Sequence, residues 1–526
     1  MKANVKEAIL MALLIACTAL PSYSKKPKID KAGKPKSVVI LYENDAHCAV
    51  DGYTRLRGLA DAISKADTAY VGVVSSGDFL QGALAGAISR GQYITDIMRP
   101  VSYDAVTLGN HEFDYGTERM IELLQMLGAP VVSSNFFKFG ATEPVYQPYI
   151  IKEYGNRCVA FIGTTTPETM RSEGYAFRDS DGRQTYDLRT SDVYALVQKA
   201  TNEARNEGAD YVVVLSHLGE EVRSTGITSH GLVQATRGID IVLDGHTHAV
   251  VPCDTVLNAD GMPVPITQTG TQLANIGKLL IDCNGRISLS LIPTDSIAYS
   301  NVCVSAATDS IKALMNSVTS RHIARLPFPL SVHEADGNGW LVRHNAAGIG
   351  DLVADAFRNC MDAEIGLVNG GSLRNSLPEG NLTYGDIVSV QPFDNHMCLI
   401  EATGEQLMGM LMKCTQKCPE YDGSFPHVSG MKYTVHALSD RITDVEIYNR
   451  SSDRYEPLDL QRTYTVGLND YYSNGGFYST LKDCRLLRST TMLSRDALAN
   501  YLETSEDGTV SEAYRQQQGR VTVLDD

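Results

Sequence analysis

Five short polar clusters, each placed directly after an apolar run, constrain the fold of this chain more than any other feature. In order along the sequence they are Asp45-Ala46-His47, Gly77-Asp78, Gly109-Asn110-His111-Glu112, His217, and Gly245-His246-Thr247-His248. The apolar runs before them cover residues 38–41, 70–74, 105–108, 211–215 and 239–243, and each predicts a buried strand. An α/β scaffold gathers residues from the carboxyl ends of its strands into one crevice. We therefore expect the five clusters to meet in a single site.

Two or three domains are expected, because 526 residues exceed what one ordinary core accommodates. From about residue 37 to 295, strand-like runs alternate with helical stretches at 58–66, 116–127 and 190–207, which indicates a layered α/β domain. We assign this domain to residues 37–300. Apolar residues at near-helical spacing predict a helix over 306–325, within a linker at 301–329. The second domain follows over residues 330–526 and carries a Gly-rich turn at Asn369-Gly370-Gly371.

The overall composition narrows the function classes. A hydrophobic fraction of 43% and a charged fraction of 21% are typical of a globular protein. The net charge of −16 argues against a nucleic-acid-binding surface, which requires a stripe of basic residues. Anionic substrates remain compatible with this charge, because bound metal ions supply positive charge locally.

The N-terminal residues are typical of an export signal. Lys2 and Lys6 precede an apolar segment at about 8–20, which is too short to anchor stably across a bilayer. Cleavage after Ser22-Tyr23-Ser24 would remove residues 1–24. Alternatively, Leu14-Ile15-Ala16-Cys17 resembles a bacterial lipobox, which would end the signal at residue 16 and leave a lipid anchor on Cys17. Both alternatives predict an exported bacterial protein, periplasmic or attached to the cell envelope, without a transmembrane segment.

The clusters contain the ligand types of a centre with two divalent cations. Such cations lie roughly 3.5–4 Å apart and share an anionic ligand. Carboxylate and imidazole accept several metals, so Zn, Mn, Mg and Co all stay open. Asp45 and His47, two residues apart on a segment expected to be extended, would point the same way and share one cation. Asp78 is the natural bridge, because a carboxylate has two oxygens. The remaining ligands would be Asn110, His217 and His246 on the second cation and His248 on the first.

The ordered set of clusters resembles the calcineurin-like metallophosphoesterase superfamily. The longer stretch Gly109-Asn110-His111-Glu112-Phe113-Asp114-Tyr115-Gly116 resembles its 5′-nucleotidase family, of the bacterial exported type. The resemblance implies a four-layer α/β/β/α metal domain and a C-terminal α/β substrate-recognition domain, joined by a helix. Carried over motif by motif, it implies the metal ligands Asp45, His47, Asp78, Asn110, His217, His246 and His248.

The resemblance implies hydrolysis of 5′-nucleotides. Two cations lower the pKa of a bound water, so that hydroxide can attack phosphorus in line, and they neutralise the developing charge. His111 follows the ligand Asn110 and can approach the phosphate without binding metal. Asp114 would orient His111 and favour its protonated form, or would instead cap the helix at 116–127. We predict that His111 and Asp114 stabilise the transition state or protonate the leaving group, and that Glu112 is a supporting hydrogen-bond acceptor.

Leaving-group recognition is expected in the second domain, on the same resemblance. Asn369-Gly370-Gly371-Ser372-Leu373-Arg374 matches a family stretch whose arginine addresses anionic or ribose oxygens. Gln391-Pro392-Phe393 matches a motif whose aromatic ring stacks on a nucleobase, and Tyr471 matches the second stacking aromatic. Arg343 is either a further substrate arginine or a surface charge.

One departure from the family pattern keeps the substrate open. After two glycines the family continues Asp-Gly-Phe, and its Asp holds ribose hydroxyls, whereas this chain continues Phe477-Tyr478-Ser479. Alternatives to 5′-nucleotides are therefore nucleotide sugars, 2′,3′-cyclic nucleotides or other phosphomonoesters. A non-catalytic surface binding protein is a further alternative, although the complete ligand set argues against it.

Overall fold

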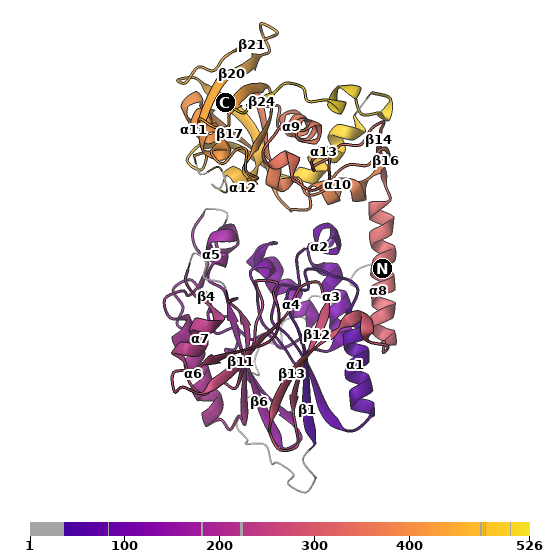
Figure 1. Ribbon diagram of the computed structural model, residues 1–526, viewed down its shortest axis with the longest axis vertical. Helices are drawn as coiled ribbons and strands as arrows, with labels where there is room; N and C mark the ends of the chain where they lie inside the picture. The colour runs from indigo at the N-terminus through magenta and orange to yellow at the C-terminus, as the bar shows by residue number, and fades with distance from the viewer. Residues whose placement is uncertain are drawn as a thin grey trace, which may run out of the picture.

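The computed structural model describes residues 36–82, 84–179, 182–220, 225–473, 476, 478, 480–504 and 506–526. The predicted signal, with its Cys17, and Phe477 lie outside these residues. The chain forms two lobes connected by α8 (Val302–Thr319), which runs along one side of the molecule (Figure 1). None of the helices in the described ranges has the length and apolarity needed to cross a membrane.

The first lobe contains two large sheets. The first has the order β13 (Ile287–Pro293), β12 (Asn275–Ile281), β1 (Ser37–Glu43), β2 (Ala69–Ser75) and β3 (Ala105–Val106). The second has the order β10 (Val250–Leu257), β11 (Pro263–Thr269), β9 (Ile241–Leu243), β8 (Tyr211–His217), β6 (Arg157–Thr165) and β5 (Tyr149–Tyr154). The pairs β1–β2, β2–β3 and β8–β9 are parallel, so their carboxyl ends face the same edge within each sheet.

Four layers pack in this lobe, as predicted. Residues from both sheets, such as Ile40 of β1 and Val213 of β8, form one buried cluster between the sheets. Strands buried on both faces require the continuous apolar runs seen in the sequence. The first sheet is covered on its outer side by α1 (Tyr53–Lys65), α2 (Leu84–Ser89), α3 (Gln92–Met98) and α4 (Thr117–Leu127). The second is covered by α6 (Val193–Asn206) and α7 (Ser229–Ala235). The short strands β4 (Phe136–Lys138) and β7 (Tyr186–Leu188) pair with each other, and α5 (Thr169–Ser172) precedes β7.

The linker helix differs from the predicted one. The apolar spacing predicted a helix over 306–325, but α8 ends at Thr319 and residues 322–326 form β14 (His322–Leu326). β14 pairs antiparallel with β16 (Gly380–Thr383), and Tyr384 N donates to the carbonyl of Arg321. Pairing with a strand so distant in sequence overrides the local helical spacing.

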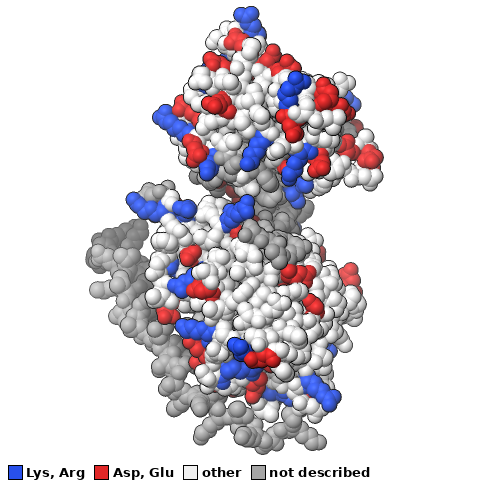
Figure 2. Space-filling model, turned by 60° about the vertical axis from the view of Figure 1, so that its left-hand side comes forward, with Lys and Arg blue, Asp and Glu red and all other residues white. Residues whose placement is uncertain are grey.

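The second lobe also combines sheets with helices. Its five-stranded sheet has the order β18 (Pro426–Ser429), β15 (Ile365–Asn369), β22 (Thr463–Asn469), β17 (His396–Thr403) and β23 (Arg485–Leu493). Its four-stranded sheet has the order β21 (Arg454–Pro457), β20 (Arg441–Asn449), β19 (Met431–His436) and β24 (Val521–Leu524). The helices are α9 (Gly348–Met361), α10 (Tyr384–Val390), α11 (Gly404–Thr415), α12 (Asp470–Ser473) and α13 (Ser494–Glu503). On the face shown in Figure 2, acidic and basic side chains are interspersed over both lobes.

Candidate metal centre

Four of the five polar clusters lie in turns that follow strands of the first lobe, and the remaining one, His217, is the last residue of β8. Asp45, His47, Asp78, His246 and His248 all have φ between 46° and 80°, which non-glycine residues rarely adopt. Such backbone conformations concentrate at functional sites, where the surrounding structure holds them in place. Asp45 and His47 therefore do not lie on an extended segment, and this part of the sequence prediction is wrong. The two side chains converge through a left-handed turn after β1, because the extended strand ends at Glu43.

The first group of ligands is Asp45, His47, Asp78 and His248. One donor atom from each lies within 4.8 Å of the others. Nε2 of His47 lies 2.8 Å from Nε2 of His248, and 3.9 Å from both Asp45 Oδ1 and Asp78 Oδ2. His248 Nε2 lies 3.5 Å from Asp45 Oδ1. The structure therefore brings together two carboxylates and two imidazoles, as predicted for one cation.

The second group shares Asp78 with the first. His217 Nε2 lies 3.0 Å from Asp78 Oδ2, and Asn110 Oδ1 lies 2.9 Å from His246 Nδ1. The centroids of the His217 and His246 rings are 5.3 Å apart, so the His217–Asp78 pair and the Asn110–His246 pair lie side by side. Asp78 thus contacts both groups of predicted ligands, at the position expected of the bridging carboxylate.

The electrostatics of these side chains fit divalent cations. Burial raises the pKa of Asp45 to about 7 and lowers the pKa of His47 to about 4, so the His47 imidazole is neutral as a ligand must be. Burial alone would lower the pKa of His217, but Asp78 and Asp45 raise it to about 10. Within the described residues, only histidines lie within ion-pair distance of Asp45 and Asp78. A buried pair of carboxylates of this kind requires positive charge, which two cations would provide.

Hydrogen bonds behind the ligands fix their orientation. His217 Nδ1 lies 2.7 Å from Ser76 O, and His47 Nδ1 lies 3.1 Å from Gln81 O, so each ring can direct Nε2 to the centre. The Glu112 carboxylate accepts hydrogen bonds from four backbone N–H groups, as predicted for a supporting acceptor. The four donors belong to Asp78, Phe79, Leu80 and Gly109.

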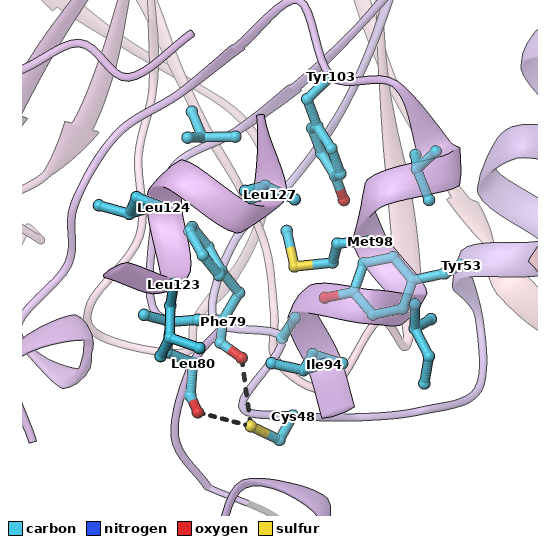
Figure 3. Close-up of a cluster of buried hydrophobic side chains, with 14 of the residues drawn as sticks. Cys48, Tyr53, Phe79, Leu80, Ile94, Met98, Tyr103, Leu123, Leu124 and Leu127 are labelled. Atoms are coloured by element: carbon cyan, nitrogen blue, oxygen red, sulfur yellow. Dashed lines mark hydrogen bonds between the residues drawn. The ribbon is translucent and has the colours of Figure 1, made fainter. Parts of the chain in front are cut away.

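A packed hydrophobic core lies next to the turns that follow β1 and β2. Figure 3 shows Cys48 beside Phe79 and Leu80, with Sγ 3.3 Å and 2.9 Å from their carbonyl oxygens. Cys48 directly follows His47, while Phe79 follows Asp78. The thiol therefore connects the segment that follows His47 with the segment that follows Asp78.

Gly109 is required by the close packing of this centre. A Cβ atom at this position would lie 2.1 Å from Asp78 Oδ1. The backbone before Asn110 can therefore approach the bridging carboxylate only without a side chain.

His111 and Asp114 form a pair at the edge of the centre. His111 Nδ1 lies 3.0 Å from Asp114 Oδ2, and His111 N donates to Asp78 Oδ1 at 2.8 Å. The first residue before α4 is Gly116, and no side chain caps the helix, so Asp114 serves His111 instead. Burial alone would lower the pKa of His111, but the carboxylates of Asp114 and Asp78 outweigh it and raise this pKa well above its usual value. His111 is about one-third exposed, at 32%, so its ring faces the open side of the site.

Two acidic residues near the centre were missed in the sequence. Glu168 Oε2 lies 3.5 Å from His246 Nε2, and Glu168 comes three residues after the end of β6. The rule that polar residues follow strand ends would have found it. Glu173 lies with His111 and Asp114 in one group whose donor atoms are within 4.8 Å of one another. Glu173 has no sequence signal, because it follows the short helix α5 in a turn without a motif.

Comparisons with known proteins agree with this geometry. Residues 38–250 match the family model for calcineurin-like phosphoesterases, and residues 331–483 match the model for the 5′-nucleotidase C-terminal domain. The chain belongs to the 5′-nucleotidase family. It is a metallophosphoesterase and therefore a phosphoric ester hydrolase.

Individual relatives of the 5′-nucleotidase family are distant in sequence. The 5′-nucleotidase of Rattus norvegicus is 24% identical over 475 residues, which cover 82% of this chain and 79% of that protein. The trifunctional nucleotide phosphoesterase protein YfkN of Bacillus subtilis is 24% identical over 487 residues, 84% of this chain but only 32% of that protein. A crystal structure of the 5′-nucleotidase precursor from Thermus thermophilus superposes with a TM-score of 0.66 at 24% identity. It covers 93% of this chain and 100% of that one, which shows a shared fold.

The 5′-nucleotidase C-terminal domain places the two predicted arginines together. The Arg343 guanidinium carbon lies 4.2 Å from the centroid of the Trp340 ring, and that of Arg374 lies 6.0 Å from it. Burial and the neighbouring Arg374 both lower the pKa of Arg343. Asn369 is buried at the end of β15, where Nδ2 donates to Gly423 O at 2.6 Å. Asn369 thus holds the turn that carries Arg374, while the two arginines concentrate positive charge around Trp340.

The two predicted stacking aromatics come from separate segments of this domain. Tyr471 lies on α12, is 38% exposed, and contacts Tyr472 edge-on with ring centroids 5.1 Å apart. Burial, and to a lesser extent the negative charge of Glu173, raise the pKa of Tyr471. Phe393 is partly buried in the loop after α10. Phe477, at the position of the missing ribose-binding Asp, lies outside the described residues.

Proposed function

We propose that this protein removes phosphate from 5′-nucleotides outside the cytoplasm, at a centre that holds two divalent cations. The observation that carries the proposal is the pair of ligand groups that share Asp78, with the His111–Asp114 pair beside them. Two cations bound there would activate water and neutralise charge on the phosphoryl oxygens. Zn, Mn, Mg and Co are all compatible with the oxygen and nitrogen donors.

The protein's own groups would orient the substrate. A protonated His111, held by Asp114, can donate a hydrogen bond to a phosphoryl or leaving-group oxygen. Arg343 and Arg374 would address anionic or hydroxyl oxygens of the leaving group. Phe393 and Tyr471 would contact a flat base, since stacking tolerates different bases.

A panel of hydrolysis assays tests the proposed activity, with the products separated by chromatography because UDP-glucose and 2′,3′-cyclic AMP can be cleaved without release of inorganic phosphate. The substrates are AMP, UDP-glucose, 2′,3′-cyclic AMP and p-nitrophenyl phosphate, each with Mn²⁺, Zn²⁺, Mg²⁺ or Co²⁺. We expect the highest kcat/KM with AMP, complete loss with a chelator, and loss in Asp78→Asn. Equal turnover of all substrates would refute nucleotide selectivity. Absence of turnover with every metal would favour the non-catalytic binding protein.

The proposed location rests on the N-terminal sequence. Lys2 and Lys6 before the apolar segment at about 8–20 support export. Mass spectrometry of the protein from a bacterial host distinguishes the two processing routes. A chain beginning at Lys25 supports cleavage after Ser24, and an acylated Cys17 supports the lipid anchor. An uncleaved chain in the cytoplasm would contradict both.

A further inference from the structure

Arg495 is a buried arginine at the contact between the two lobes. It lies on α13 of the second lobe, and its side chain is 3% exposed. Its Nη2 donates at 2.7 Å to the carbonyl oxygen of Ala87, on α2 of the metal domain. The same Nη2 lies 2.6 Å from Asp394 Oδ1. One guanidinium thus connects a metal-domain helix to a loop of the substrate domain.

The loop it holds carries the predicted stacking ring. Asp394 directly follows Phe393, and Arg495 Nη1 donates to the Phe393 carbonyl at 3.2 Å. The Asp394 side chain is 8% exposed, and its Oδ2 lies 3.4 Å from Arg90 Nε of the metal domain. The Phe393 carbonyl thus accepts a hydrogen bond from Arg495, and the carboxylate of the next residue lies within ion-pair distance of Arg495 and Arg90.

Arg90 extends this set of contacts to the catalytic pair. Its Nη2 donates to the carbonyl oxygen of Tyr115 at 3.3 Å, and Tyr115 directly follows Asp114. Consecutive contacts therefore lead from the His111–Asp114 pair through Arg90 and Asp394 to Phe393.

The burial of the Arg495 guanidinium restricts the partners with which it can be stable. A guanidinium as buried as that of Arg495 is tolerated only with a carboxylate and further acceptors, and Asp394 and Ala87 provide them. Sliding one lobe against the other would separate Arg495 from Ala87 and Arg90 from Asp394. Helix α10 of the second lobe also packs against α2 of the metal domain and against the linker helix α8.

We propose that Arg90, Asp394 and Arg495 are positioning residues that set where Phe393 lies relative to the metal centre. They act through Phe393 and do not touch the reacting atoms. The inference rests on the proposed function, in which Phe393 contacts the leaving group. The kcat/KM for a substrate whose leaving group stacks on Phe393 should therefore depend on these residues. The kcat/KM for a small aryl phosphate should depend on them less.

Arg90 is the residue to change, because it is half exposed and its loss leaves the buried Arg495–Asp394 pair intact. The measured quantity is kcat/KM for AMP divided by kcat/KM for p-nitrophenyl phosphate. We expect Arg90→Ala to lower this ratio about 2- to 5-fold, as for loss of a partly exposed ion pair. Arg90→Glu should lower it about 10-fold, because it faces Asp394 with a like charge, and Arg90→Lys should restore it. Arg99→Ala is the matched control, since Arg99 pairs with Asp96 of its own domain.

A second measurement does not depend on nucleotide turnover. Small-angle scattering of the full chain compares the wild type with Arg90→Glu and Arg99→Ala in 50 mM and 500 mM NaCl. If AMP is hydrolysed, the ratio decides: an unchanged ratio in both Arg90→Ala and Arg90→Glu overturns the proposal. If AMP is not hydrolysed, the proposed function fails and scattering decides instead. A larger radius of gyration for Arg90→Glu alone then supports the interdomain role, and identical scattering overturns it.

Discussion

Replacing Glu112 with Gln tests whether one buried carboxylate organises the bridging ligand. Oε2 of Glu112 accepts from Asp78 N at 2.8 Å and Gly109 N at 2.5 Å. Oε1 accepts from Phe79 N at 2.7 Å and Leu80 N at 3.1 Å. Gln has one oxygen and one NH₂ group, and the NH₂ group would face two N–H donors that it cannot satisfy.

The expected cost follows from these contacts. Each buried N–H left without an acceptor costs about 1–3 kcal/mol, and loss of the carboxylate charge weakens the two remaining bonds. We therefore expect Glu112→Gln to lower the free energy of unfolding by about 3–5 kcal/mol. Because Asp78 is one of the four donors, its carboxylate should shift, and metal affinity should fall about 10- to 100-fold, as for other residues that support ligands.

Two independent assays check this expectation. Urea unfolding of the chelated protein, followed by circular dichroism, measures stability without a metal contribution. Titration with Mn²⁺ of the folded variant then measures affinity. Glu122→Gln is the control, since Glu122 is exposed on α4 and should change stability by less than about 0.5 kcal/mol. A loss below about 1 kcal/mol in Glu112→Gln, with unchanged Mn²⁺ affinity, would refute the reasoning.

Three further changes probe the centre and its surroundings. His111→Ala should lower kcat about 100-fold while bound metal, measured by mass spectrometry, stays at the wild-type level; lost metal would make His111 a ligand. His217→Ala should lower bound metal from two equivalents to one, and two equivalents would remove His217 from the ligand set. Burial raises the pKa of Glu43 from 4.5 to about 8, so the folded state holds this proton more tightly and stability is lost as pH rises through 8. Glu43→Gln should therefore stabilise the protein by about 3–5 kcal/mol at pH 8.5 and by little at pH 4, and equal thermal shifts at both pH values would contradict this.

The strands and the polar clusters behind them could be predicted because both signals are local. A continuous apolar run that ends in a polar cluster identified β1, β2 and β8 almost to their ends. Parallel neighbours then bring their carboxyl ends together without any knowledge of side-chain contacts. The convergence of Asp45 and His47 was predicted from an extended segment, but it arises from a left-handed turn after β1. The alternation of apolar and polar residues carries no signal for such a turn.

Features set by distant segments could not be predicted in this way. β14 forms at residues 322–326 because β16 lies beside it, although the local spacing favours a helix. Glu173 joins His111 and Asp114 only because the fold brings the turn after α5 beside this pair. In both cases, the partner that decides the structure lies far away in the sequence.

The same distinction separates the chemistry of this protein from its choice of substrate. The predicted metal ligands all lie in one domain, at the ends of its strands or in the turns that follow them. Phe393 instead depends on Arg495, and Arg495 donates to Ala87, 408 residues earlier in the chain. Substitutions between the lobes can therefore change which leaving group is accepted while the ligand turns stay intact. A 5′-nucleotidase fold built this way can diversify its substrates without rebuilding the centre that cleaves the phosphate ester.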